Sequence, residues 1–431
     1  MTNKRLLSID ILRGLGIMVI LVIHRIHYHW SGMQSTETLK THFSGPWMPF
    51  IVFVIALLTM AGIFYFMTGI VNAYSMYSRV AKGKSSSTKI MMFGLAGGIW
   101  IFLMNYVQRF FFMNGFVAGE NGEVPKYPVG LLTGCIQDSA NVTFRWSQLT
   151  EPGTLSLIGL VVIFVSLVLG ILLRDNYQEK INKIHLILLI LAILSIGLSP
   201  FSKFYLRPIF DIYMEEGHYF KALGIGLICR EFGLSPYLGY GFIGAALGIS
   251  LAHGEDRKTL HRKGLYSAIG LLISGAIMIL IFDKTDDFER GAIGTGICMI
   301  ELGLFIFILK ILLKVFDYAN EQKIGVRQQK SRGMRRFGML ALTVFIFEPV
   351  VAEILKKTID SIVGTNWNNH LPLVLLFGFF CLLFWHLLLK QWEKVNFAGS
   401  LEWFTGRIML KLIKKKTGKT SFNELRTPYL S

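Results

Sequence analysis

The chain has 431 residues, of which 53% are hydrophobic and only 16% are charged. Soluble globular proteins carry roughly a quarter charged residues, so too little of this sequence can face water for a soluble protein. The 44 Lys and Arg exceed the 27 Asp and Glu, for a net charge of +17. In a soluble protein this excess would indicate nucleic acid as a partner, whereas in a membrane protein it first indicates orientation.

Apolar stretches of about 20 residues, the length that spans a bilayer core, recur along the whole chain. A Gly-rich stretch at 220–233 precedes the sixth of them. The sequence therefore predicts an all-α, polytopic integral membrane protein with about ten transmembrane helices. The predicted spans are 6–26, 46–74, 90–112, 154–173, 184–198, 236–251, 265–282, 293–313, 337–355 and 371–389.

Basic residues predict the orientation of these spans. With the N-terminus in the cytoplasm, 29 of the 44 Lys and Arg fall in cytoplasmic segments, as the positive-inside rule requires, and both termini are cytoplasmic. We expect one transmembrane domain over 1–395 and a basic amphipathic tail over 396–431, suited to an anionic inner leaflet. The extracytoplasmic loop 113–151 is long enough to be a binding surface or lid. It carries a glycosylation sequon at Asn141, whose use stays open.

Ionisable residues inside membrane helices are costly, and the first helix holds the densest set. Arg13 and His24 are 11 residues apart, which places them within roughly 20° of each other and about 16 Å apart along a helix. Asp10 lies three residues before Arg13 and can pair with it. Gly14 and Gly16 would let a neighbouring helix or a ligand approach closely.

Two interpretations of this face stay open. Asp10 and Arg13 can form a structural pair at the inner interface, with His24 an interfacial residue at the outer end. Alternatively, the face is a polar pathway in which His24 accepts and returns a proton, since the pKa of histidine lies near neutrality. The spacing of His24, His27 and His29 does not place all three on one helix face, so we expect no metal site.

The first helix resembles the opening of the transmembrane acyltransferases. Residues 5–14 read Arg-Leu-Leu-Ser-Ile-Asp-Ile-Leu-Arg-Gly, and His24 follows Asp10 after fourteen residues. This is similar to heparan-α-glucosaminide N-acetyltransferase-like proteins and to bacterial membrane O-acyltransferases. Residues 66–69 (Phe-Met-Thr-Gly) and 236–244 (Pro to Gly) resemble further segments of these families.

The C-terminal third resembles a membrane domain often attached to the bacterial relatives. The matching segments are 338–343 (Gly-Met-Leu-Ala-Leu-Thr) and 399–403 (Gly-Ser-Leu-Glu-Trp). Val344 replaces the usual Asn of this pattern, and Glu348 stands where Gln is common. These departures leave the subfamily and the acceptor open.

The resemblance implies an enzyme that moves an acyl group across a membrane. The donor would be cytosolic acetyl-CoA or another acyl-CoA, and the acceptor a sugar hydroxyl or amine of a glycan or glycolipid outside the cell membrane. His24 would act as general base or as a transiently acylated nucleophile. Asp10 and Arg13 would belong to the acyl-CoA pathway or form a structural pair. Membrane lipids are further partners, a homo-oligomer stays open, and neither metal nor nucleic acid is expected.

Other membrane-embedded charges are candidates for supporting such a site. Each can equally be a structural hydrogen-bonding partner or reach the interface. Glu353 lies five residues after Glu348, a spacing that we expect to separate the two around the helix. The supporting candidates are Arg109, Arg230, Glu231, Glu301 and Glu348.

A transporter or a lipid or glycan flippase is the rival class, because buried charges and a Gly-interrupted segment also suit transport. A catalytically inactive scaffold is a third. His24 separates the first two, since transport does not need an imidazole at that position. N- or O-acylation and the length of the acyl chain stay open.

Overall fold

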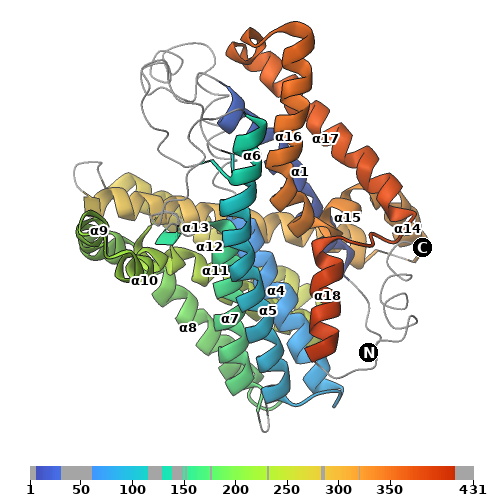
Figure 1. The fold of residues 1–431 in the computed structure, drawn as a ribbon. Coiled ribbons are helices and arrows are strands. Elements are labelled where there is room, and N and C mark those ends of the chain that lie inside the picture. Colours follow the sequence, from blue (N-terminus) through green and yellow to red (C-terminus); the bar gives the residue numbers. More distant parts are fainter. Residues whose placement is uncertain are drawn as a thin grey trace. The chain divides into compact units, whose positions relative to one another are not determined.

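The computed structural model describes residues 6–30, 61–114, 129–137, 149–150, 153–174, 177–230, 233–282, 287–319 and 321–412. Every regular element among them is a helix (Figure 1). Seven of these helices are long and apolar enough to cross a membrane, or up to nine spans result when each of two bent pairs counts as one. The predicted all-α, multi-pass integral membrane protein is therefore confirmed.

Several predicted spans differ in detail. The second, 46–74, begins outside the described residues, and its later part belongs to α4 (Gly62–Ala81). The fifth corresponds to α8 (Ile181–Gly197), which continues after a 49° bend into α9 (Ser199–Glu215). The Gly-rich stretch forms the short helix α10 (Tyr219–Cys229). Pro200 lies in the first turn of α9, where the missing N–H of proline costs no helical hydrogen bond, and a second proline, Pro208, lies inside the helix.

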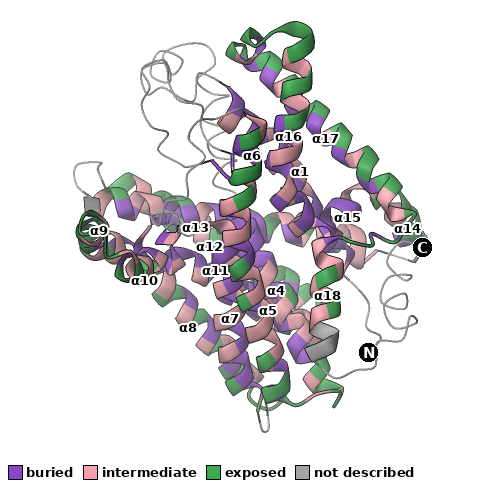
Figure 2. Ribbon diagram, viewed as in Figure 1, coloured by how far each residue is buried: buried purple, intermediate pink, exposed green. Residues whose placement is uncertain are grey.

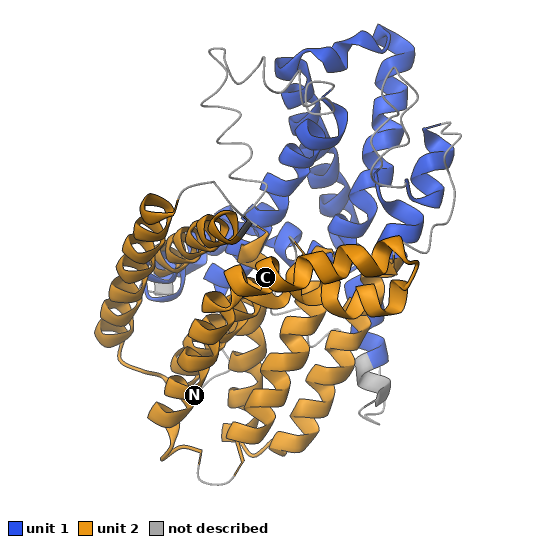
Figure 3. Ribbon diagram, turned by 90° about the vertical axis from the view of Figure 1, so that its left-hand side faces the viewer, with its two compact units in different colours: residues 1–60, 107–144, 313–431 blue, residues 61–106, 145–312 orange. Residues whose placement is uncertain are grey.

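The chain forms two compact units, each assembled from separate stretches of sequence (Figure 3). Unit 1 comprises residues 1–60, 107–144 and 313–431, and unit 2 comprises 61–106 and 145–312. This division does not decide whether one functional domain covers 1–395, which stays a prediction.

Unit 2 is built around α11 (Leu234–His253), which packs against α4, α7 and α8. A Cβ at Gly69 would lie 2.1 Å from the carbonyl oxygen of Gly241, so α4 and α11 touch backbone to backbone. Segments 66–69 and 236–244 thus meet at one small-residue interface, typical of membrane helices. Unit 2 also contains α9 and α10, together with α5 (Ser87–Val107, ending at the unit boundary), α7 (Thr154–Leu172), α12 (Arg257–Ile281) and α13 (Asp287–Leu312).

Unit 1 surrounds α1 (Leu7–His29), whose residues are all buried or intermediate in exposure (Figure 2). This helix packs against α15 (Arg332–Met339), α16 (Ala341–Val363) and α17 (Leu371–Glu393). The predicted ninth span is in fact α15 and α16, which meet at an 86° bend. The remaining elements of this unit are η2 (Gln108–Phe112), α6 (Leu131–Ile136), η4 (Leu313–Asp317), α14 (Glu321–Lys330), η5 (Asn366–Asn369) and α18 (Leu401–Leu412).

Glycines bring α1 and α15 into direct backbone contact. A Cβ at Gly14 would lie 1.9 Å from the carbonyl oxygen of Met334, and one at Gly338 would lie 2.1 Å from that of Asp10. The prediction that Gly14 admits a neighbouring helix is confirmed, and that helix is α15. Since α15 leads directly into α16, this crossing fixes where α16 starts relative to α1.

Gly14→Ala is expected to destabilise the protein by about 1–3 kcal/mol, because the added methyl group meets a backbone carbonyl that cannot rotate away. The measurement is thermal unfolding in a mild detergent. Gly97→Ala in α5 is the matched control, since a Cβ there meets no described atom within 4 Å, and alanine favours a helix by up to about 1 kcal/mol. Equal unfolding temperatures for the two variants would contradict the close approach.

Candidate active site

The candidate site lies on α1 and α16. The N-terminus of each of these helices is capped by a carboxylate from a residue distant in sequence. The first backbone N–H groups of a helix lack partners within it, and the helix dipole favours negative charge there. At α1 the Asp317 carboxylate accepts from the backbone N–H of Leu7 (2.8 Å) and of Ser8 (3.0 Å). The start of α1 is therefore fixed by η4, some 310 residues away.

Glu402 of α18 caps α16 in the same way. Its Oε1 accepts from the backbone N–H of Leu342 (2.8 Å) and of Thr343 (3.1 Å), and its Oε2 accepts from the Thr343 hydroxyl. The Thr343 hydroxyl oxygen in turn accepts from the backbone N–H of Leu401 (2.9 Å). Segments 338–343 and 399–403, which share a resemblance to one membrane domain, thus contact each other, and the tail helix is packed onto α16.

Glu402→Ala is expected to lower stability by about 1–2 kcal/mol, because the cap of α16 is lost and buried N–H groups are left without acceptors. Glu402→Gln keeps a carbonyl acceptor and should lose clearly less. Thermal unfolding of both variants beside the parent protein measures the difference. If alanine and glutamine cost the same, capping is not what this side chain contributes.

His24 and Glu348 form a hydrogen-bonded pair between α1 and α16. The His24 Nδ1–H donates to Glu348 Oε1 over 2.5 Å. The His24 side chain is 20% exposed and Glu348 is only 2% exposed, so the carboxylate lies behind the ring. Among the described residues this is the hydrogen bond that the ring makes, which leaves Nε2 available. A neutral imidazole held at Nδ1 by a carboxylate presents Nε2 as a base, the arrangement of a histidine that accepts protons in catalysis.

Arg25 completes the group on the other oxygen of the carboxylate. Its Nη2 donates to Glu348 Oε2, and its side chain is 0% exposed. The Nε and Nη1 groups of Arg25 are also buried and make no hydrogen bond within the described residues. A guanidinium that uses so few of its donors contributes mainly its charge, which offsets that of the Glu348 carboxylate between its two partners.

A second histidine–glutamate pair lies further along the same two helices. His29 Nε2 is 2.8 Å from Glu353 Oε1, and both side chains are almost fully buried. His29 follows His24 by five residues and Glu353 follows Glu348 by five, so α1 and α16 run parallel here. Five residues separate the two glutamates by about 140° around α16, yet each pairs with a histidine of α1, which advances by the same five residues.

The side chains of His24, Arg25, His29, Glu348 and Glu353 form a polar row between α1 and α16. Aromatic and aliphatic side chains enclose this polar row. The His24 ring lies 5.5 Å from the Tyr28 ring and 6.2 Å from the Phe345 ring, and the His29 ring lies 5.5 Å from the Phe377 ring. A buried apolar cluster that includes Trp30 and Phe377 lies at the His29 end of the row. Water is thus excluded from Arg25 and His29, while His24 keeps an exposed edge.

The structure separates Asp10 and Arg13 from this group along α1. Asp10 is buried, and Arg13 donates a long hydrogen bond of 3.4 Å to the Gly338 carbonyl oxygen, so this end of the helix faces α15 rather than α16. Arg13 and His24 remain about 16 Å apart along the helix. This geometry fits both the structural and the pathway interpretation of Asp10 and Arg13.

The other predicted residues lie elsewhere. Arg109 is buried in η2, a π-helical segment that packs against α16, the helix of Glu348. In unit 2, Arg230 lies over the Phe210 ring at 5.0 Å, and Glu301 accepts from the Tyr240 hydroxyl at 3.3 Å. Glu231 lies outside the described residues.

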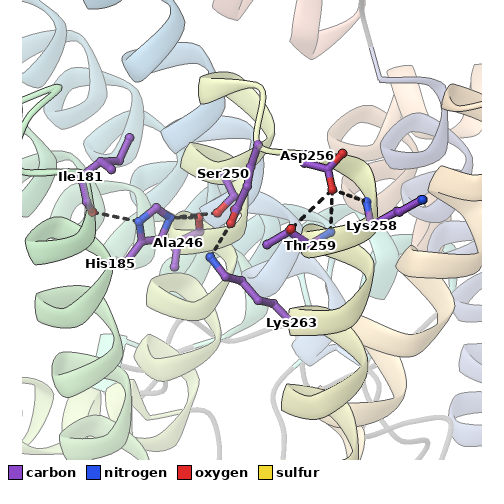
Figure 4. Close-up of polar contacts among 9 residues, drawn as sticks. Ile181, His185, Ala246, Ser250, Asp256, Lys258, Thr259 and Lys263 are labelled. Carbon is purple, nitrogen blue, oxygen red and sulfur yellow. Dashed lines mark hydrogen bonds and ion pairs between the residues drawn. The ribbon is translucent and has the colours of Figure 1, made fainter.

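His185 in unit 2 provides a contrast to His24 (Figure 4). Its Nδ1 is 2.9 Å from the Ile181 carbonyl oxygen, and its Nε2 is 2.9 Å from the Ser250 hydroxyl, so both ring nitrogens are engaged. Such a ring is a structural connector between α8 and α11.

The basic segment after α11 is partly neutralised within itself (Figure 4). Lys263 forms an ion pair with Glu255, and Asp256 caps α12 by accepting from the backbone N–H of Lys258 and of Thr259. The hydrogen bond from the Thr259 backbone is the main reason that the pKa of Asp256 is lowered. The charge of this loop available to an anionic donor is therefore smaller than the number of its lysines and arginines suggests.

Three residues of the polar row were not selected from the sequence. Arg25, His29 and Glu353 carry ionisable side chains in predicted spans or at their ends. The energetic cost of placing such side chains in a membrane was the one signal in the sequence that could have identified them. Glu348 and Glu353 stand beside His24 and His29. Within the described residues, no group of three or more metal-binding side chains occurs.

No protein-family model matches the chain, and no curated protein matches it. The likeness to the transmembrane acyltransferases therefore rests on the short motifs alone.

Proposed function

We propose that this protein is a membrane acyltransferase that carries an acyl group from cytosolic acyl-CoA to a hydroxyl or amine of a glycan or glycolipid on the extracytoplasmic side of the cell membrane. The observation that carries the proposal is the His24–Glu348 pair, in which a buried carboxylate holds Nδ1, leaves Nε2 without a hydrogen-bonding partner among the described residues, and belongs to a histidine side chain that is 20% exposed. The resemblance of the first helix to transmembrane acyltransferases supports the same reaction.

The reaction balances around His24. Nε2 takes the proton of the acceptor as the acceptor oxygen or nitrogen bonds to the acyl carbon, and the carbon–sulfur bond of the thioester breaks. The proton then passes from His24 to the departing CoA thiolate. In the variant of this route, the acyl carbon bonds first to Nε2 as the carbon–sulfur bond breaks and CoA leaves as the thiolate. The acceptor then bonds to the acyl carbon, the bond from the acyl carbon to Nε2 breaks, and the acceptor proton passes through the freed Nε2 to the thiolate. The Glu348 carboxylate, paired with Arg25, stabilises positive charge on the ring in either route.

The test compares cells with and without the protein. Mass spectrometry of cell-surface glycans and lipids should show an acetyl or longer acyl group that disappears with the protein. Purified protein in liposomes, supplied with isotope-labelled acyl-CoA on one side, should transfer the label to the recovered acceptor. Unchanged glycans and lipids, together with no labelled product, would refute acyl transfer.

A proton-coupled transporter is the second candidate, and the pair His29–Glu353 favours it. This pair is buried, and acyl transfer does not require it. A buried histidine–glutamate pair that the acyl-transfer reaction does not use would suit a proton pathway through His29 and Glu353. Substitution of His24 distinguishes the candidates, because acyl transfer needs its Nε2.

A further inference from the structure

An apolar groove of 830 Å³ runs along one side of unit 1, lined by the end of α16, by η5 and by α17. It extends along α17 from His370 to Leu383, which is about 20 Å of helix. The lining is hydrocarbon and aromatic along this length, while Asn366 and His370 supply polar groups at one end. His24, Arg25 and Glu348 are not among the residues that line the groove, and the groove belongs to no step of the proposed reaction.

The wall of the groove is held in place by its own contacts. The Trp367 indole N–H donates to Asp360 Oδ1 over 2.7 Å, and Lys356 Nζ donates to Asp360 Oδ2 over 2.5 Å. The Trp367 ring packs edge-on against the Phe377 ring, with centroids 5.1 Å apart. Two large rings are therefore fixed on the groove side of unit 1 rather than free to fill the groove.

The surroundings of the groove determine what can occupy it. α17 is one of the helices that can cross a membrane, and many of its residues are exposed (Figure 2). In a bilayer, exposed apolar side chains beside the groove, such as Leu376, would contact hydrocarbon. One leaflet contributes about 15 Å of hydrocarbon, a depth that the groove exceeds. A chain of one leaflet can thus lie along α17 with its head at the polar end.

The polar end favours a phosphate head group. His370 and Asn366 are exposed there and can donate to phosphate oxygens. The nearby Asp360 carboxylate is already engaged by Lys356 and by the Trp367 indole N–H, so its charge opposes a phosphate less. We propose that the groove is a binding site for one glycerophospholipid, with an acyl chain between His370 and Leu383 and the phosphate at the end formed by Asn366 and His370.

This site adjoins the polar row through one side chain. Phe377 lines the groove and its ring also lies 5.5 Å from the His29 ring. A bound chain supports the wall against which the pair His29–Glu353 packs. The proposal does not depend on acyl transfer, because its readouts are bound lipid and protein stability.

The experiment uses the full chain purified in a mild detergent. Native mass spectrometry and phosphate analysis of extracted lipid count the phospholipid that remains bound. Leu376→Trp places a larger ring beside the groove at a position that is 64% exposed, so folding should tolerate it. Leu387→Trp is the matched control, 51% exposed on the same face of α17 but outside the groove.

We expect the parent protein and Leu387→Trp to retain about one phospholipid each and Leu376→Trp to lose it at least severalfold. Adding phospholipid to delipidated protein should raise the unfolding temperature of the first two and not of the third. Equal retention in both tryptophan variants would overturn the proposal and leave only non-specific lipid around the helix. A bound glycan-linked lipid in place of a phospholipid would also overturn it.

Discussion

His24→Ala is expected to reduce acyl transfer by roughly 10²–10⁴-fold, the usual contribution of a positioned general base. The variant removes Nε2, the proposed base, and also leaves Glu348 with Arg25 alone. Transfer of label from acyl-CoA to the acceptor measures the rate, with elution volume and helical content confirming the fold. The proposed mechanism requires this loss.

His24→Asn separates chemistry from structure at the same position. Its amide can replace the Nδ1–H bond to Glu348 but offers no base, so it should be folded and as inactive as the alanine variant. His185→Asn is the matched control in unit 2, where the ring is engaged at both nitrogens, and we expect it to keep acyl transfer. Normal acylation by either His24 variant would mean that His24 is not the base. Retained transport with no acylation in any form of the protein would instead favour the transporter.

Arg25→Met is expected to destabilise the protein by about 3–5 kcal/mol, the cost of leaving one partner of a buried ion pair uncompensated. Glu348 is 2% exposed and retains only His24 as a hydrogen-bonding partner in this variant. The carboxyl group must then take up a proton or remain charged in an apolar interior, and either outcome costs stability. Unfolding by denaturant titration in micelles measures the loss.

The double variant Arg25→Met/Glu348→Gln tests the cause. If the cost comes from an unpaired carboxylate, neutralising Glu348 removes most of it, and the double variant is more stable than Arg25→Met alone. Arg25→Lys keeps the charge and should lose less than methionine does. Additive losses in the double variant would show that Arg25 stabilises the protein through packing rather than through Glu348.

Elements with strong local signals could be predicted from the sequence. The first helix, predicted as 6–26, is observed as Leu7–His29, and the tenth, predicted as 371–389, is observed as Leu371–Glu393. Apolar length decides such helices, because an unpaired backbone cannot cross hydrocarbon. The helix α9 and the 86° bend between α15 and α16 were not predicted. Hydropathy locates apolar segments but contains no information on the angle between successive helices.

The site could be predicted only in part. His24 stood out because an ionisable side chain in an apolar helix is costly whatever its partners are. Glu348 was selected for the same reason, but its pairing with His24 joins residues 324 positions apart. Glu353 was not selected, because its spacing from Glu348 places the two on different sides of one helix. Spacing within one helix does not show which residues of a neighbouring helix lie opposite each position.

The sequence by itself determined that this is a helical membrane protein, where most of its spans lie and which helix holds the costly charges. These properties can be predicted segment by segment, because whether a helix is stable in a bilayer depends largely on the length and polarity of that segment alone. Only the tertiary structure decided which charges meet: Asp317 and Glu402 cap α1 and α16, and Glu348 lies between His24 and Arg25. Such contacts depend on how distant helices pack, and packing is set by the shapes of all the neighbours together.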